Sequence, residues 1–186
     1  MTVDAAERIR AVLTEADAGL LAQLAGVRPV AVGWATVELE RAELELSAAL
    51  ALSADGFGPA ASSIALGARC RIAPGALGDA LALVLLEPET EGRLAATLAR
   101  LGEGPAVVWL VVAGCDTTDA GSATDAASAT LRLFATMTAA VRPGPLGPER
   151  LVLGGPIHGP HHLLVARMVV ADLRSRHDGP AGTIQP

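Results

Sequence analysis

The stretch PVAVGWATVELERAELELSAALAL, residues 29–52, contains the change of periodicity that decides the fold class. In its first part Val30, Val32 and Trp34 alternate with small residues, which is typical of a β-strand. From Glu38 to Leu52 the pattern becomes helical. A strand that runs directly into a helix indicates a domain that combines helices with a sheet.

Shorter signals of the same kind occur along the rest of the chain. We expect further strands at residues 66–72, 81–86, 107–112, 150–153 and 162–170, and further helices at residues 4–25, 89–101 and 131–141. Residues 55–63 and 143–148 contain Gly and Pro and predict loops. This order predicts an α+β fold, in which two βαβββ-like halves form a concave mixed sheet after an N-terminal amphipathic helix.

The same pattern predicts a division of the chain into five segments. The N-terminal helix occupies residues 1–28, and the first βαβββ-like module occupies residues 29–114. A segment rich in Thr, Ser, Ala and Asp, residues 115–129, predicts a linker. A second, degenerate module then covers residues 130–176, and the Gly- and Pro-containing residues 177–186 predict a mobile tail.

Composition limits the classes of protein to consider. The 186 residues fit one domain, and 51% of them are apolar, so we expect a sizeable core. Aromatic side chains are scarce and comprise Trp34, Phe57, Trp109 and Phe134. Lys, Asn and Tyr are absent. Because the codons of these three residues are AT-rich, their absence indicates a GC-rich genome, and we expect a high-GC bacterium as the source.

Charge and hydropathy argue against two kinds of partner. The formal net charge is −6 and the arginines are scattered, whereas a nucleic-acid partner requires clustered Lys or Arg. No apolar stretch reaches the ~20 residues of a membrane span, and the N-terminus does not resemble a secretory signal. Cys70 and Cys115 lack CxxC spacing and predict reduced thiols. We therefore expect a cytoplasmic protein that binds neither nucleic acid nor membrane.

Two stretches resemble the vicinal oxygen chelate superfamily, the glyoxalase and bleomycin-resistance group. Residues 34–42, WATVELERA, are similar to the opening strand and acidic helix start of its modules. Residues 85–88, LLEP, followed by Leu94, Leu98 and the Gly102-Glu103-Gly104 break, resemble the middle of methylmalonyl-CoA epimerase-like members. The resemblance covers about a third of the chain and implies a concave sheet that holds a small molecule.

The resemblance also implies a metal site that this chain lacks. Family enzymes hold a divalent metal with His, Gln or Glu side chains on the strands of the cup. At the matching positions the sequence has Gly33 and Trp34, Leu83 and Val84, Ala106 and Val107, and Leu164 and Val165. Alkyl side chains provide no metal ligand, so we expect no metal and no cofactor.

The three histidines His158, His161 and His162 form a dense cluster of potential metal ligands. Pro and Gly residues around them break the helix that would bring them together, and no Cys or carboxylate lies nearby. We interpret the segment as an exposed turn at the rim of a pocket, where His158 contacts a ligand.

Glu87 is the candidate catalytic residue. It follows an apolar run, and burial would raise its pKa and make it a general base. The alternative interpretation is that it ends the strand and favours the N-terminus of the following helix. The acidic run Glu38, Glu40, Glu43 and Glu45 indicates a solvated surface instead.

Trp34 and Trp109 are the candidate ligand-binding residues. Two tryptophans on strands of a chain with so few aromatic residues either stack on a ligand or pack in the core. Both interpretations stay open at this point.

Three functions follow from these observations. The first is a metal-free binding protein, expected to be a homodimer, for a small apolar or aromatic molecule contacted by Trp34, Trp109 and His158. The second is a metal-independent isomerase or lyase that acts on an acyl-type substrate with Glu87 as base. The third is an accessory subunit that packs on a partner protein.

Overall fold

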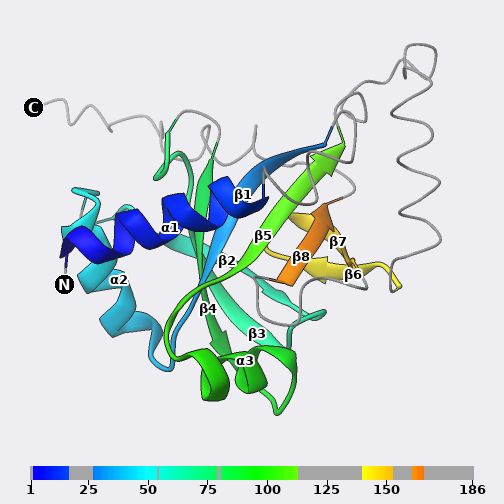
Figure 1. Ribbon diagram of the computed structural model, residues 1–186. Coiled ribbons are helices and arrows are strands. Elements are labelled where there is room, and N and C mark those ends of the chain that lie inside the picture. The colour runs from blue at the N-terminus through cyan, green and yellow to red at the C-terminus, as the bar shows by residue number, and fades with distance from the viewer. Residues whose placement is uncertain are drawn as a thin grey trace, which may run out of the picture.

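The computed structural model describes residues 2–16, 27–53, 55–78, 81–112, 140–152 and 161–165 (Figure 1). In these residues three helices accompany one eight-stranded sheet. The helices are α1 (Thr2–Ala16), α2 (Leu39–Ala49) and α3 (Arg93–Leu101). The strands are β1 (Val27–Ala35), β2 (Gly58–Ser63), β3 (Ala68–Ala73), β4 (Ala82–Pro88), β5 (Gly104–Val112), β6 (Arg142–Gly144), β7 (Gly147–Leu151) and β8 (His161–Val165).

The sheet consists of two halves with the same internal order. Its strand order is β2-β3-β4-β1-β5-β8-β7-β6. The first strand of each half pairs in parallel with the last, β1 with β4 and β5 with β8. The halves join through the antiparallel pair β1 and β5 in the middle. The predicted α+β fold, with an N-terminal helix and a mixed sheet built from two halves of the same strand order, is therefore confirmed, and the predicted helix of the second half lies outside the described residues.

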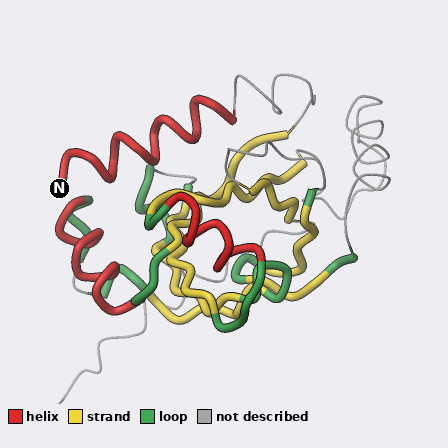
Figure 2. Tube along the Cα trace, turned by 60° about the horizontal axis from the view of Figure 1, so that its bottom comes forward, coloured by secondary structure: helices red, strands yellow, loops and turns green. Residues whose placement is uncertain are grey.

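The central strands are apolar on both sides because both faces of the sheet are covered. Side chains alternate between two buried clusters along each strand. On the outer face, Val32, Trp34 and Leu85 pack against α1 and α2. On the inner face, Val84, Leu86, Trp109 and others form the larger core. Figure 2 shows α1 and α2 outside the curved sheet.

The sheet curls so far that its two edge strands approach each other. The N–H of Ile64, directly after β2, donates a hydrogen bond of 3.1 Å to the carbonyl of Pro143 in β6. The inner face is thus enclosed, and Trp109 and Leu86 on it are fully buried.

Two expected loops contain strands. Residues 58–63 form β2, and residues 143–148 contribute to the hairpin of β6 and β7. The loop predictions were wrong there because Pro59 and Pro143 suggest a break in the sequence. Both prolines lie on the two edge strands of the sheet. An edge strand has a neighbour on one side only, so a proline there can lack an N–H without breaking the hydrogen bonding between strands.

The other predicted elements either agree with the structure or fall outside the described residues. The strand at 107–112 and the helix at 89–101 are seen as β5 and α3, and α3 ends at Gly102, whose φ of 75° favours glycine. The linker 115–129, most of the helix 131–141 and the tail 177–186 lie outside the described residues. In the described part of the chain, no helix has the length and apolarity to cross a membrane.

Candidate functional site

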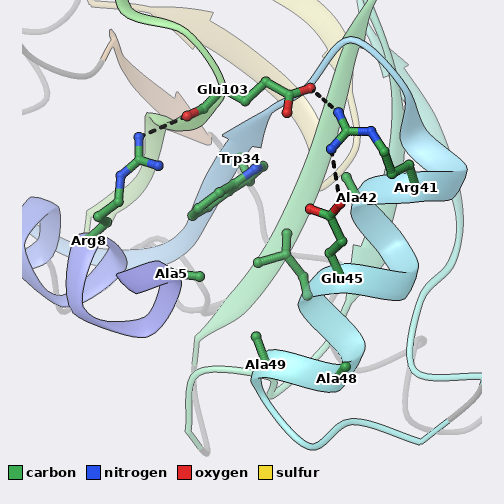
Figure 3. A pocket seen from close by; sticks show the side chains of 10 residues that line it. Ala5, Arg8, Trp34, Arg41, Ala42, Glu45, Ala48, Ala49 and Glu103 are labelled. Atoms are coloured by element: carbon green, nitrogen blue, oxygen red, sulfur yellow. Dashed lines mark hydrogen bonds and ion pairs between the residues drawn. The ribbon is translucent and has the colours of Figure 1, made fainter. Parts of the chain in front are cut away.

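A cleft of about 410 Å³ lies between α1, α2 and β1, on the outer face of the sheet (Figure 3). Three elements that are distant in sequence supply its walls. Its lining residues are Ala5, Arg8, Trp34, Arg41, Ala42, Glu45, Leu46, Ala48, Ala49 and Glu103. Five of these are alanine or leucine, so the cleft has an apolar wall along the two helices and charged groups at its rim.

Trp34 forms the aromatic wall of the cleft. It points from β1 toward the helices, and 9% of its surface remains exposed. The guanidinium carbon of Arg8 lies 5.1 Å from the centroid of its ring, a cation–π arrangement. Arg8 also donates a hydrogen bond of 2.8 Å from Nη2 to the backbone carbonyl of Glu103. These contacts hold α1 against the start of β5.

Arg41 and Glu103 form the charged rim on the α2 side. Arg41 contacts Glu103 at 2.6 Å and Glu45, one turn along α2, at 3.2 Å. The same oxygen of Glu103, Oε1, accepts hydrogen bonds from the hydroxyl of Thr36 and the N–H of Val37. The hydrogen bond from Arg41 is the main cause that lowers the pKa of Glu103 to about 2. Glu103 is therefore a charged structural anchor and a weak base.

Glu87, the predicted catalytic residue, lies near the end of β4 and does not line the cleft. Its side chain is 17% exposed, and both oxygens contact Arg69 at 2.7 and 2.8 Å. Oε2 also accepts a hydrogen bond of 2.9 Å from the N–H of Leu39, the first residue of α2. Glu87 therefore caps the N-terminus of α2. Its position in the sequence predicted instead that it would favour the N-terminus of the helix that follows it, α3.

The two tryptophans lie on opposite faces of the sheet. Trp34 faces the cleft, whereas Trp109 is fully buried in the inner core. The indole N–H of Trp109 donates to Glu149 Oε2 at 2.8 Å, and the hydroxyl of Ser63 donates to Glu149 Oε1 at 2.5 Å. Burial raises the pKa of Glu149, and the two hydrogen bonds oppose that rise.

The histidine cluster is only partly described. His158 lies outside the described residues, and the backbone of His161 and His162 belongs to β8, opposite Val107 and Val108 of β5. Within the described ranges, no three His, Cys, Asp or Glu side chains lie close enough together to hold a metal ion. At two positions where the family resemblance implies ligands, the inner face has Val84 and Val107. These residues do not fit a divalent metal.

Most of the charged groups in the cleft and in the core were not predicted from the sequence. Arg8, Arg41 and Glu103 line the cleft, and Glu149 lies in the core. The spacing of Arg41 and Glu45, four residues apart on a helix, was an available signal for their ion pair. Nothing local signals the contacts of Arg8 or Glu149, because their partners are 95 and 40 residues away.

Comparisons with known proteins support the fold. No family model matches the chain, and no curated protein matches it. Among solved structures, the chain is similar to methylmalonyl-CoA epimerase from Streptomyces coelicolor, at 22% identity and a TM-score of 0.51, covering 76% of this chain and 97% of that one. It is also similar to the epimerase from Mycobacterium tuberculosis, at 19% identity and a TM-score of 0.52, covering 79% and 91%.

A hypothetical protein from Bacillus halodurans has the same arrangement, at 13% identity and a TM-score of 0.52, covering 74% of this chain and 92% of that one. At these identities the likeness shows a shared fold. It agrees with the fold that the resemblance in the sequence implied.

Proposed function

We propose that this protein binds a small apolar or aromatic molecule in the cleft between α1 and α2, with Trp34 as the aromatic wall. The observation that carries the proposal is the combination of a cleft of about 410 Å³, a Trp in its wall and an apolar lining of small residues. Ligand sites in proteins are typically concave, mostly apolar and equipped with a few polar groups.

The small side chains of the helices make room for such a molecule. Ala5 on α1 faces Ala42 and Ala49 on α2 across the cleft, as Figure 3 shows. Larger residues at these positions would bring the helix surfaces into contact and fill the space. The rim of Arg41, Glu45 and Glu103 is held by its own ion pairs and supports a preformed site.

This proposal places the ligand on the outer face of the sheet. Trp109 is fully buried on the inner face and its N–H already has a partner, so Trp34 supports the proposal more directly than Trp109. A contact between His158 and the ligand stays a prediction, as do the homodimer and the cytoplasmic location.

An isomerase acting on an acyl-type substrate is the second candidate. The likeness to structures named methylmalonyl-CoA epimerase favours it. It requires a carboxylate base beside a cavity, and Glu87 is instead engaged by Arg69 and Leu39. Of the carboxylates that line the cleft, Glu103 has a pKa of about 2 and is a poor base. The binding function therefore has the stronger support.

The test is a blocking substitution with a matched control. Ala48 is exposed on α2 and lines the cleft, so Ala48→Trp fills the opening without disturbing the core. Leu44→Trp places the same side chain on the same helix, at a residue that is 75% exposed and outside the cleft. We expect a panel of aromatic probes, measured by calorimetry, to bind the wild type and L44W but not A48W.

Native mass spectrometry of the purified protein provides an independent readout. It detects a co-purifying small molecule, and it reports the number of chains in the assembly. If no aromatic probe binds the wild type, or if A48W binds as well as L44W, the proposal is wrong.

A further inference from the structure

We infer that the ligand of this cleft carries a carboxylate and that Arg8 of α1 binds it. The inference rests on the proposed function, and it adds the chemical class of the ligand and the residue that selects it. It follows from the charges around the cleft, which are not equivalent.

Arg41 has no capacity left for a ligand. Its guanidinium contacts Glu103 at 2.6 Å, Glu45 at 3.2 Å and Glu38 at 3.6 Å. The hydrogen bond to Glu103 is the main cause that raises the pKa of Arg41 above its usual range. A ligand anion at Arg41 would have to compete with three carboxylates that are already part of the protein.

Arg8 is different, since no carboxylate among the side chains that the structure describes lies within 4 Å of it. Its hydrogen bond goes to the neutral backbone carbonyl of Glu103, and its guanidinium lies over the ring of Trp34. Only Nη2 takes part in that bond. The N–H groups of Nη1 and Nε have no partner among the side chains that the structure describes, and they can donate to an acceptor in the cleft.

The backbone near Arg8 is shaped to leave room for its guanidinium. A side chain at Gly104 would collide with Arg8 Nη2 and with its guanidinium carbon. Glycine at this position therefore permits the close approach that brings Arg8 over the rim of the cleft. The carbonyl of Glu103 and the ring of Trp34 then fix the orientation of the guanidinium.

These features specify the ligand. A guanidinium binds a planar carboxylate through two N–H groups at once, and such charge-assisted bonds are strong. One guanidinium balances the single negative charge of a carboxylate, whereas a phosphate dianion would need a second cation. The wall of Trp34, Ala42 and Leu46 beside it requires an apolar or aromatic body. The expected ligand is an aromatic or aliphatic carboxylic acid.

The test compares 2-naphthoate with its uncharged analogue 2-naphthamide by isothermal titration calorimetry. We expect the wild type to bind naphthoate about tenfold more tightly or better, from one charge-assisted pair. Arg8→Gln should reduce the preference to about twofold or less while its affinity for naphthamide stays within about threefold of the wild type. Arg10→Gln is the matched control, because Arg10 is exposed on the same helix and outside the cleft, and it should keep the preference.

The outcomes separate this inference from the function it rests on. If naphthamide and naphthoate bind the wild type equally, the cleft binds small molecules but the assignment of a carboxylate is wrong. If R8Q weakens both probes to the same extent, Arg8 only shapes the cleft and the inference is overturned. If neither probe binds the wild type, the proposed function itself fails, and the inference fails with it.

Discussion

The indole N–H of Trp109 donates a hydrogen bond of 2.8 Å to the carboxylate of Glu149, which is fully buried inside the curled sheet. Trp109 belongs to β5 in the middle of the sheet, and Glu149 belongs to β7 near its edge. The bond therefore spans the enclosed inner face. Ser63 of β2 donates to the other carboxylate oxygen, so three strands meet at one buried acid.

We predict that Glu149 makes the stability of the protein depend on pH. Its pKa is raised in the folded state by burial, so the folded chain holds the proton more strongly than the unfolded chain. The resulting stabilisation is present below the ordinary pKa of 4.5 and is lost as the pH rises through the folded-state value. Urea denaturation at several pH values should show an unfolding free energy that declines with rising pH above 4.5.

Glu149→Gln is the comparison for this prediction. The amide does not titrate, so the difference in unfolding free energy between wild type and E149Q should change with pH. A difference that stays constant from pH 5 to pH 8 would contradict a raised pKa of Glu149.

Gly33 should not tolerate a methyl group. A Cβ at this residue would lie 2.7 Å from the ring of Trp109, 2.7 Å from Leu86 and 2.9 Å from Val107, all buried. We expect Gly33→Ala to lower the unfolding free energy by about 1–3 kcal/mol through overpacking. Gly58→Ala on β2 is the control, because a Cβ there would meet nothing within 4 Å. Equal stability of G33A and G58A would refute the close packing of Trp109 on β1.

Glu87→Ala should destabilise the start of α2. Glu38, the N-cap residue of this helix, makes no side-chain capping bond, and Glu87 accepts the hydrogen bond from Leu39 in its place. Losing a cap of this kind costs about 1 kcal/mol. Thermal unfolding followed by circular dichroism measures the effect. Glu91→Ala, at an exposed residue beyond the same strand, should leave the melting temperature unchanged.

Glu103 should make the protein sensitive to acid. Because the hydrogen bond from Arg41 lowers its pKa to about 2, the stabilisation from this carboxylate is present above the ordinary pKa of 4.5 and is lost as the pH falls toward 2. We expect Glu103→Gln to be less stable than the wild type at pH 6, and the gap to narrow on acidification to pH 3. Glu7→Gln on α1, an exposed residue, is the control. A gap that widens toward pH 3 would argue against the Arg41 contact.

The sequence alone determined the helices and the central strands of the sheet, together with their order. Alternation at Val30, Val32 and Trp34 and helical spacing after Glu38 predicted β1 and α2, because periodicity is a local property that follows from backbone geometry. The continuous apolar run of β5 predicted a central strand, since only a strand covered on both faces lacks polar alternation. Edge strands β2 and β6 escaped prediction because their prolines carry the signal of a loop.

Tertiary structure decided the rest, because it depends on contacts between residues far apart in the chain. Alternation places Trp34 and Trp109 on a sheet but does not say which face the helices cover, and so it could not assign one to the cleft and the other to the core. The burial of a carboxylate and its hydrogen bonds depend on the residues that pack around it. Arg69 and Leu39 engage Glu87, and Ser63 and Trp109 keep Glu149 buried. The free energy of a buried or paired charge is set by these long-range neighbours, which no local pattern encodes.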